Sequence, residues 1–308
     1  MNHLDQFAKE LEIPALGGLG VSNVVKKCIR HLDEERAAHP DRWDAVARAC
    51  REHRLHSLFL EDPYTNRAFS KPRGYAGDAV MLDFVYGHRD ARDAIAASSE
   101  IGRGILAYTG GGSPPARAVR WRRARAAQEI EELASKPGIA RVLAFACGHL
   151  REVELLHPEL RRRVRITAAD MDDKSLEVVA NEYGRDHSID CRRISVRDLL
   201  TNKHGFEHGF DLIYTLGLFD YLSDAWAERL VPVFWSLLSP EGKMIIANFT
   251  PKTEGAAYME AVMDWWLHYR TVDALLGWIE LIERQSIAAH ELFSDPFGQI
   301  AFLSLERR

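Results

Sequence analysis

The sequence predicts an α/β fold in which a doubly wound, mostly parallel seven-stranded sheet ends in an antiparallel hairpin and follows a helical domain. Two observations predict it. After about residue 140, short apolar segments alternate with amphipathic ones, which is the rhythm of βαβ units in a parallel sheet. Near the C-terminus, two strand-like segments are instead joined by a short Pro-Gly turn, which is typical of an antiparallel hairpin.

The N-terminal part of the chain reads as helical. Apolar residues recur at three- and four-residue spacing between about residues 20 and 105, and the segment 61–80, with its prolines, glycines and tyrosines, interrupts them. Residues 109–115 contain three glycines and two prolines, which predicts a linker. We therefore predict an N-terminal helical domain over 1–112 and a second domain over 113–308.

The second domain is predicted to open with a helix that ends near Lys136, before a Pro-Gly pair. Arg123 falls inside the apolar stripe of this helix. The predicted strands that follow cover residues 141–146, 163–170, 190–198, 210–217 and 242–250. The predicted helices between them cover 151–157, 173–184 and 224–242, and the terminal hairpin covers 286–307.

Composition and cysteine usage exclude several classes of protein. With 308 residues, 46% of them hydrophobic, the chain can bury a large core, and its net charge of −5 does not predict a nucleic-acid-binding surface. The polar start predicts no signal peptide, and the longest apolar runs are too short for membrane insertion. The four cysteines form no C-x-x-C pair or zinc-type cluster, so we expect free thiols, no bound metal and a cytoplasmic location.

Small and acidic residues follow the ends of the predicted strands, where ligands bind in such sheets. Gly148 follows the first strand, and Asp170 ends the second strand, 22 residues later. An acid at about this spacing can accept hydrogen bonds from both hydroxyls of a ribose. Asp198 ends the third predicted strand and is placed to accept from an adenine amino group, and Gly217 ends the fourth.

The turn around Gly148 argues against a phosphate ligand. A pyrophosphate-binding turn has several glycines, so that backbone N–H groups can approach the anion. Ala146 and Leu150 occupy two of those places here, which weakens NAD and FAD as cofactors. S-adenosylmethionine has no phosphate and needs one close approach of the backbone, so it is the cofactor that the turn favours.

From about residue 125 onward, the sequence resembles the class I S-adenosylmethionine-dependent methyltransferases, which have a Rossmann-like fold. The matching segments are 168–179, 194–200, 210–222 and 237–249. The glycine-rich motif of that family, V-L-D-x-G-x-G-x-G, is represented by V-L-A-F-A-C-G-H-L, which lacks the acid and two glycines. The chain also resembles a bacterial group that makes an extracellular factor, 3-hydroxypalmitic acid methyl ester, in segments 71–78, 146–154, 216–224 and 263–271.

The resemblance implies a cofactor site. Ala146 and Gly148 would face the methionine chain, and Asp170 would hold the ribose. The further residues that it implies are Met171 beside the ribose acid, Arg197 and Asp198 flanking adenine, Thr215, Leu216 and Gly217 bordering the sulfonium, and Tyr75 closing over the cofactor. Arg123 could pair with the cofactor's carboxylate, and an internal ion pair is the alternative.

The substrate is a small molecule whose identity the sequence leaves open. The candidate catalytic residues are Tyr214, Asp220, Tyr221 and His268, and the candidate substrate-binding residues are Tyr258, Trp265, Tyr269 and Arg270. Trp265 and Tyr269 could equally be core residues. A pocket with His268 or Arg270 suits a carboxylate, whereas one with Asp220 suits a cationic amine or guanidine.

The resemblance favours O-methylation of the carboxylate of a hydroxy fatty acid. N-methylation of a small amine or guanidine, and binding of S-adenosylmethionine without catalysis, stay open. We expect no nucleic-acid partner, and a homodimer formed through the helical domain stays open as well.

Overall fold

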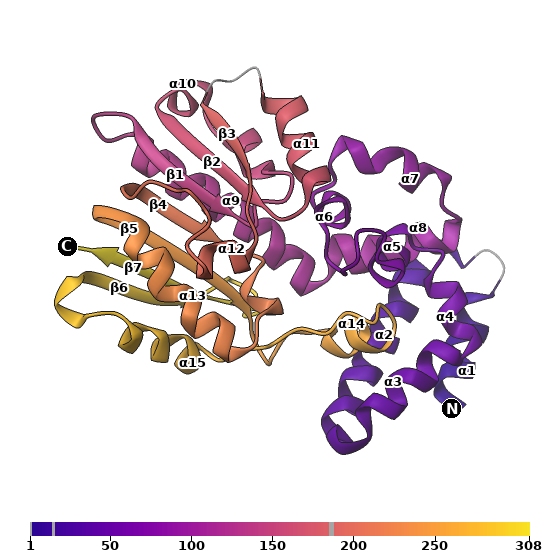
Figure 1. Ribbon diagram of the computed structural model, residues 1–308. Coiled ribbons are helices and arrows are strands. Elements are labelled where there is room, and N and C mark those ends of the chain that lie inside the picture. The colour runs from indigo at the N-terminus through magenta and orange to yellow at the C-terminus, as the bar shows by residue number, and fades with distance from the viewer. Residues whose placement is uncertain (1, 14–15, 185–187) are drawn as a thin grey trace. The chain divides into compact units, whose positions relative to one another are not determined.

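The computed structural model describes residues 2–13, 16–184 and 188–308. By the closeness of their Cα atoms, the residues form two compact units. The helical unit comprises Met1–Arg120 with Lys252–Trp266, and the sheet unit comprises Trp121–Pro251 with Leu267–Arg308. Figure 1 labels the α-helices and strands of both. The division of the chain into domains at 112/113 stays a prediction.

The helical unit confirms the helical pattern of the N-terminal part. Its elements, with η for 3₁₀- and π-helices, are α1 (Asn2–Leu11), α2 (Gly17–Ala38), η1 (Pro40–Arg42), α3 (Trp43–Glu52), α4 (Arg54–Phe59), α5 (Pro63–Ser70), α6 (Ala79–Tyr86), η2 (Arg89–Ala91), α7 (Arg92–Ala97), α8 (Glu100–Leu106), η3 (Ala107–Gly112) and α14 (Ala256–Ala261). Helices α2 and α8 pack closely, since a Cβ on Gly104 would come within 2.6 Å of the Cβ of Val21. The three glycines of the predicted linker belong to η3, a π-helical turn that continues α8.

Seven strands form one sheet in the part of the chain that the structure describes, in the order β3-β2-β1-β4-β5-β7-β6. They are β1 (Ala140–Phe145), β2 (Val164–Asp170), β3 (Ile189–Arg193), β4 (Phe210–Thr215), β5 (Leu238–Phe249), β6 (Ile287–Ser294) and β7 (Ile300–Arg307). Strands β1 to β5 run parallel, and β7 is antiparallel to both β5 and β6. The predicted parallel sheet with a terminal hairpin is therefore confirmed. The strand order reverses direction between β1 and β4, which defines the switch point.

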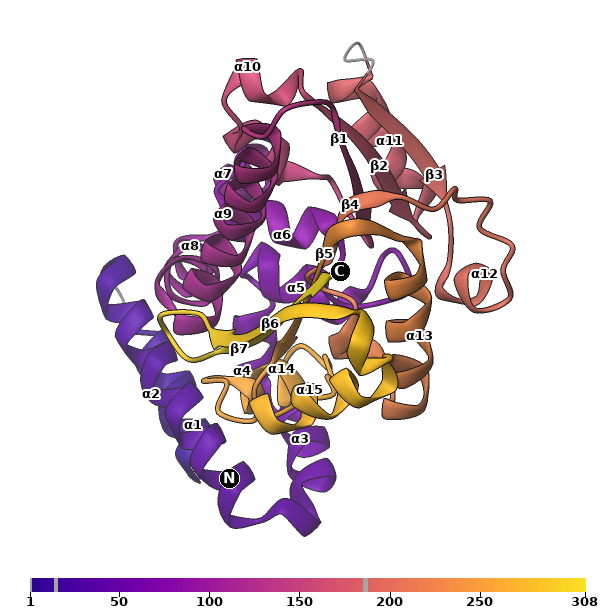
Figure 2. The same cartoon turned by 90° about the vertical axis from the view of Figure 1, so that its left-hand side faces the viewer.

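Helices cover both faces of the sheet. Besides α9 (Pro114–Ala134), inside which the two units divide, they are η4 (Arg151–Leu155), α10 (Pro158–Arg161), α11 (Asp173–Tyr183), α12 (Val196–Leu200), η5 (Phe219–Tyr221), α13 (Asp224–Leu237), α15 (Val272–Gly277), η6 (Trp278–Leu281) and η7 (Arg284–Ser286). Figure 2 shows α9 and α13 on opposite sides of the sheet. On the α13 side, Phe234 packs edge-on against Phe145 within a continuous apolar core.

Two local predictions differ from the structure for identifiable reasons. The third strand ends at Arg193, well before Asp198, because Ser195 caps α12 in a reciprocal capping box with Asp198. The helix predicted at 151–157 is only the 3₁₀-helical η4, because the chain turns at His157, which caps α10 ahead of Pro158. None of the helices in the described ranges is long and apolar enough to cross a bilayer.

Candidate functional site

The turn after β1 keeps a glycine-type backbone although it contains one glycine. Ala146, Gly148 and Leu150 have φ angles of +54°, +54° and +52°, in the left-handed region that favours glycine. These are the three positions at which the family motif has glycines. Leu150 is fully buried, and Ala146 packs against the apolar core. The two missing glycines are thus replaced by residues whose side chains contribute to the protein interior while the backbone path is retained.

We expect Ala146→Gly to stabilise the protein by about 1 kcal/mol, because an L-residue in the left-handed region carries a strain that glycine does not. Urea unfolding of the purified variant measures the effect. Gly148→Ala is the matched control and should destabilise by about the same amount. A lower stability for Ala146→Gly would contradict the strain that its φ angle implies.

Asp170, at the end of β2, is bonded to this turn. One carboxylate oxygen accepts from Gly148 N–H at 2.9 Å, and the other accepts from Asp172 N–H at 2.9 Å. Its side chain is buried, and burial raises its pKa from the ordinary value, against these hydrogen bonds. The next residue, Met171, is 61% exposed. The structure therefore brings together the acid and the glycine that the sequence paired, with an exposed apolar side chain beside them.

Asp198 follows the end of β3 by five residues and lies in α12. Its Oδ2 accepts from the Ser195 backbone N–H at 2.9 Å and from the Ser195 hydroxyl at 2.6 Å, and these bonds lower its pKa. Its Oδ1 makes no hydrogen bond to the residues that the structure describes. The segment is tied to the edge because Ile194 N–H donates to the Asp170 carbonyl at 3.0 Å. Arg197 is exposed. Their roles beside adenine stay predictions.

The end of β4 is lined by polar groups that the sequence analysis identified only in part. Thr215 is fully buried, and its hydroxyl has no hydrogen-bond partner among the described residues. The Tyr214 hydroxyl donates to Glu152 Oε1 at 2.5 Å. Arg122 Nη2 lies 3.6 Å from the point where a Cβ on Gly217 would be. Glu152 and Arg122 were not predicted from the sequence, although Arg122 lies three residues after buried Val119 and four before buried Ala126 on α9.

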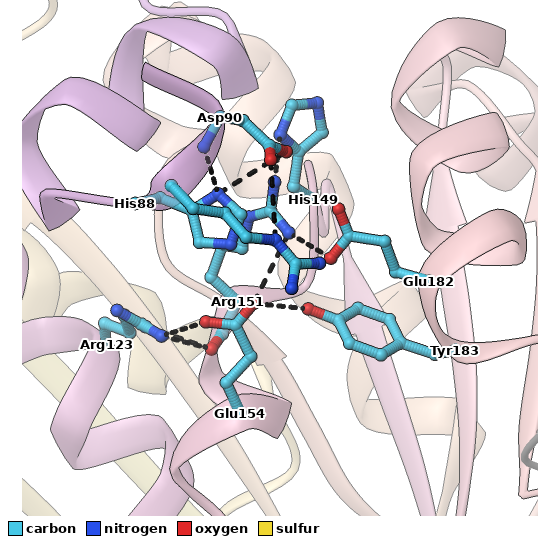
Figure 3. A network of polar contacts seen from close by, with 9 residues as sticks. His88, Asp90, Arg123, His149, Arg151, Glu154, Glu182 and Tyr183 are labelled. Carbon is cyan, nitrogen blue, oxygen red and sulfur yellow. Dashed lines mark hydrogen bonds and ion pairs between the residues drawn. The ribbon is translucent and has the colours of Figure 1, made fainter. Parts of the chain in front are cut away.

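Arg123, the neighbour of Arg122, takes part in an internal network (Figure 3). Its guanidinium donates to the Arg151 carbonyl at 3.0 and 2.7 Å and to Glu154 at 2.8 Å. Glu154 also accepts from the Tyr183 hydroxyl at 2.9 Å, and the buried Arg151 side chain donates to Glu182 at 2.6 Å. Arg123 therefore has the internal ion pair that the sequence left as the alternative, and the network fixes η4 beside the turn.

Asp220 and His268 meet beyond the end of β4. Asp220 is 2% exposed, and its carboxylate accepts from Phe249 N–H at 2.6 Å. Burial raises its pKa to about 6, and the nearby charge of Arg122 opposes this shift. The Asp220 carbonyl accepts from the His268 backbone N–H at 2.7 Å, and His268 is exposed. Tyr221 and Tyr269 are half-buried.

The guanidinium of Arg270 is held by hydrogen bonds within the protein. Arg270 is buried, and its guanidinium donates to Asp224 at 2.9 and 2.8 Å, to Asn248 at 2.8 Å, and to the carbonyls of Phe219 and Leu222 at 2.7 and 2.5 Å. Every nitrogen of the guanidinium therefore donates to the protein itself. The arrangement holds the segment before α15 against the end of β5.

Three of the predicted site residues belong to the helical unit: Tyr75, Tyr258 and Trp265. Tyr258 is buried, its hydroxyl lies 2.9 Å from that of Thr65, and burial raises its pKa. Trp265 is also buried. Their roles stay predictions, and the candidate site is built from the sheet unit.

A trio in the helical unit has the composition of metal ligands. Asp83, His88 and Asp90 each place one ligand atom within 4.8 Å of the others. His88 Nδ1, however, accepts from Asp90 N–H at 3.3 Å as the cap of η2. The absence of a bound metal stays a prediction.

Comparison with known proteins finds relatives by structure. No family model matches the chain, and no curated protein matches it in sequence. A "possible exported protein" from Bordetella parapertussis superposes with a TM-score of 0.57 at 15% identity over 83% of this chain and 98% of its own. A "putative methyltransferase" from Thermobifida fusca superposes with a TM-score of 0.51 at 16% identity over 74% of this chain and 93% of its own.

The N-methyltransferase NodS from Bradyrhizobium japonicum, solved with S-adenosyl-L-homocysteine, is more distant, with a TM-score of 0.42 at 13% identity over 60% of this chain and 87% of its own. The first two likenesses agree with the strand order: the chain has a Rossmann-like fold with a reversed seventh strand, the fold that its resemblance to class I methyltransferases implied.

Proposed function

We propose that this chain is an S-adenosylmethionine-dependent methyltransferase that acts on a small molecule. The bond between Asp170 and Gly148 is the observation that supports this most strongly, because it joins an acid at the end of β2 to the turn after β1. A carboxylate there has lone pairs left for the two hydroxyls of a ribose. The exposed side chain of Met171 offers an apolar surface for adenine.

The N–H groups of the turn support a cofactor without phosphate. Cys147 N–H donates to the Ala169 carbonyl at 3.2 Å, Gly148 N–H donates to Asp170 at 2.9 Å, and Leu150 N–H donates to the Cys147 carbonyl at 2.9 Å. A pyrophosphate site needs such groups free and a helix N-terminus behind them. Here η4 is a 3₁₀-helix of 5 residues. The residues present therefore fit S-adenosylmethionine and do not fit a dinucleotide.

The chemistry divides simply between cofactor and protein. When bound, S-adenosylmethionine supplies a methyl group already activated by its sulfonium. The protein must orient the acceptor atom in line with that group and exclude water. Thr215, Leu216 and Gly217 border this place in the proposal, and Gly217 leaves room beside the acceptor.

Among acceptors, we propose a carboxylate, in line with the resemblance to the hydroxy fatty acid methyl ester group. A carboxylate needs no base, whereas an ammonium or guanidinium must first lose a proton. Asp220 would have to contact a cationic substrate, but it is 2% exposed and its carboxylate is bonded to Phe249 N–H. The exposed imidazole of His268 suits a carboxylate better. N-methylation is the second candidate.

A methyl-transfer assay distinguishes these acceptors. Purified protein is incubated with S-adenosylmethionine and two panels, one of fatty and hydroxy fatty acids and one of amines and guanidines. We expect methyl esters from the first panel. Product from the amine panel alone would overturn the carboxylate proposal, and cofactor binding without any product would favour a non-catalytic binding protein.

Asp170→Ala is expected to weaken binding of S-adenosylmethionine at least about tenfold, because the ribose loses a charged hydrogen-bond acceptor. Isothermal titration calorimetry measures the affinity. Asp173→Ala is the matched control, since Asp173 is an exposed acid three residues further on, and its affinity should stay within about twofold. No heat from S-adenosylmethionine with the unmodified protein, or heat from NAD instead, would refute the proposed cofactor.

A further inference from the structure

The guanidinium of Arg122 is buried and makes no hydrogen bond to the residues that the structure describes. Arg122 is 5% exposed, and its Nη1 is buried with no hydrogen-bond partner among the described residues. Its Cζ lies 5.9 Å from the centre of the Phe249 ring, and its Nη2 approaches Gly217. Burial raises the pKa values of Glu152 and Asp220, and the charge of Arg122 opposes this rise, yet neither carboxylate hydrogen-bonds to it. Burying a charge in this state is costly, which points to an anionic ligand.

Its neighbour Arg123 provides the contrast. Both arginines lie near the apolar stripe of α9, but the Arg123 guanidinium is held by the Arg151 carbonyl and the Glu154 carboxylate (Figure 3). Arg123 is therefore engaged by this network. Of the two arginines, Arg122 is the one that can donate hydrogen bonds to a ligand.

Glu152 differs from the other charged residues of η4 in its hydrogen-bond partners. Arg151 and Glu154, on either side of it, are bound to Glu182 and to Tyr183 (Figure 3). Glu152 is half-buried, and among the side chains that the structure describes it accepts only from the Tyr214 hydroxyl, at 2.5 Å. Burial raises its pKa, and the charges of Arg123 and Arg122 oppose this shift. One of its oxygens is thus left for a cationic group.

Arg122 and Glu152 both contact the segment 214–217 at the end of β4. Glu152 bonds to Tyr214, and Arg122 lies against Gly217. Thr215 lies between Tyr214 and Gly217 in the chain, and its buried hydroxyl has no hydrogen-bond partner among the described residues. The family motif has its acid at position 144, where this chain has Ala144, and Ala144 is the strand partner of Tyr214. Glu152 supplies a carboxylate beside that pair from a position eight residues later in the chain.

We infer that Arg122 and Glu152 form a binding site for an α-amino-acid group, with Arg122 binding its carboxylate and Glu152, oriented by Tyr214, binding its ammonium. A group that carries both charges on neighbouring atoms matches a cation and an anion that flank one strand end. The inference rests on the proposed function, because the amino-acid group there would be the methionine end of S-adenosylmethionine.

Two ligands that differ only in this group test the inference. S-adenosylhomocysteine and 5′-methylthioadenosine share the thioadenosine, but only the first has an amino-acid end. Calorimetry on the full chain should give tighter binding of S-adenosylhomocysteine. Arg122→Met and Glu152→Gln should each weaken it about tenfold or more while changing the affinity for 5′-methylthioadenosine by less than about twofold.

The controls separate failure of the inference from failure of the proposed function. Arg122→Lys keeps the positive charge and should recover part of the lost affinity. Equal binding of both ligands by the unmodified protein, or equal losses of both in the variants, would overturn the amino-acid site while leaving the cofactor in place. Binding of neither ligand by the unmodified protein would overturn the proposed function itself.

Discussion

Arg270→Leu is expected to lower the free energy of unfolding by about 3–5 kcal/mol. The change removes the Arg270 donors to the side-chain oxygen of Asn248 and to the Leu222 carbonyl, and it leaves the Phe219 carbonyl with one donor, the Leu222 N–H at 3.1 Å. Leucine cannot bond to these oxygens, and each buried acceptor left unsatisfied costs about 1–3 kcal/mol. It also removes the guanidinium that lies 5.4 Å from the centre of the Trp278 ring.

Urea or thermal unfolding measures this effect. Asp224→Ala is the matched control, because the Asp224 side chain is 78% exposed whereas its ion-pair partner Arg270 is buried. That variant should lose less than about 1 kcal/mol. If Arg270→Leu has the same free energy of unfolding as the unmodified protein, Arg270 does not hold the segment before α15. That result would favour its predicted role in substrate binding.

Asp220→Asn is expected to gain stability relative to the unmodified protein as the pH rises from about 4 to about 6. Burial raises the pKa of Asp220 from 3.8 to about 6 in the folded protein. The folded state thus binds the proton more tightly than the unfolded state, so ionisation of Asp220 destabilises the fold as pH increases through this range. Asparagine does not ionise, so the difference should grow by roughly 2–3 kcal/mol and then level off.

Urea unfolding at a series of pH values measures this difference. Asp198→Asn is a control of opposite sign, because hydrogen bonds from Ser195 lower the pKa of Asp198 and its contribution is lost as the pH falls. A difference for Asp220→Asn that does not change with pH would show that Asp220 ionises in the folded protein as it does in the unfolded chain.

Along the second half of the chain, secondary structure could be predicted because burial follows local periodicity. A parallel strand covered on both faces reads as a short apolar run, and the Pro-Gly turn marks the reversed hairpin. The predicted secondary structure was wrong where a side chain caps a helix and so ends the preceding element. Ser195 caps α12, so Asp198 lies in a helix rather than at a strand end, and His157 with Pro158 confines the preceding helix to one 3₁₀ segment.

The site was only partly predictable. The spacing between Gly148 and Asp170 indicated a pair that the structure joins at 2.9 Å. The choice between Arg122 and Arg123 could not be predicted, because both lie near one stripe of α9 and only the packing of η4 decides which of them finds partners. Arg270 was predicted to bind substrate, but its guanidinium is engaged by residues from distant parts of the chain.

The alternation of strands and helices, the reversed hairpin and the pairing of an acid with a glycine at the carboxyl edge of the sheet could be predicted from the sequence, since they depend on local pattern and on the direction of parallel strands. Which charged side chains have partners within the protein depends instead on how distant segments pack. Hydrogen bonds between distant segments engage Arg123 and Arg270 and leave Arg122 and Glu152 at the end of β4.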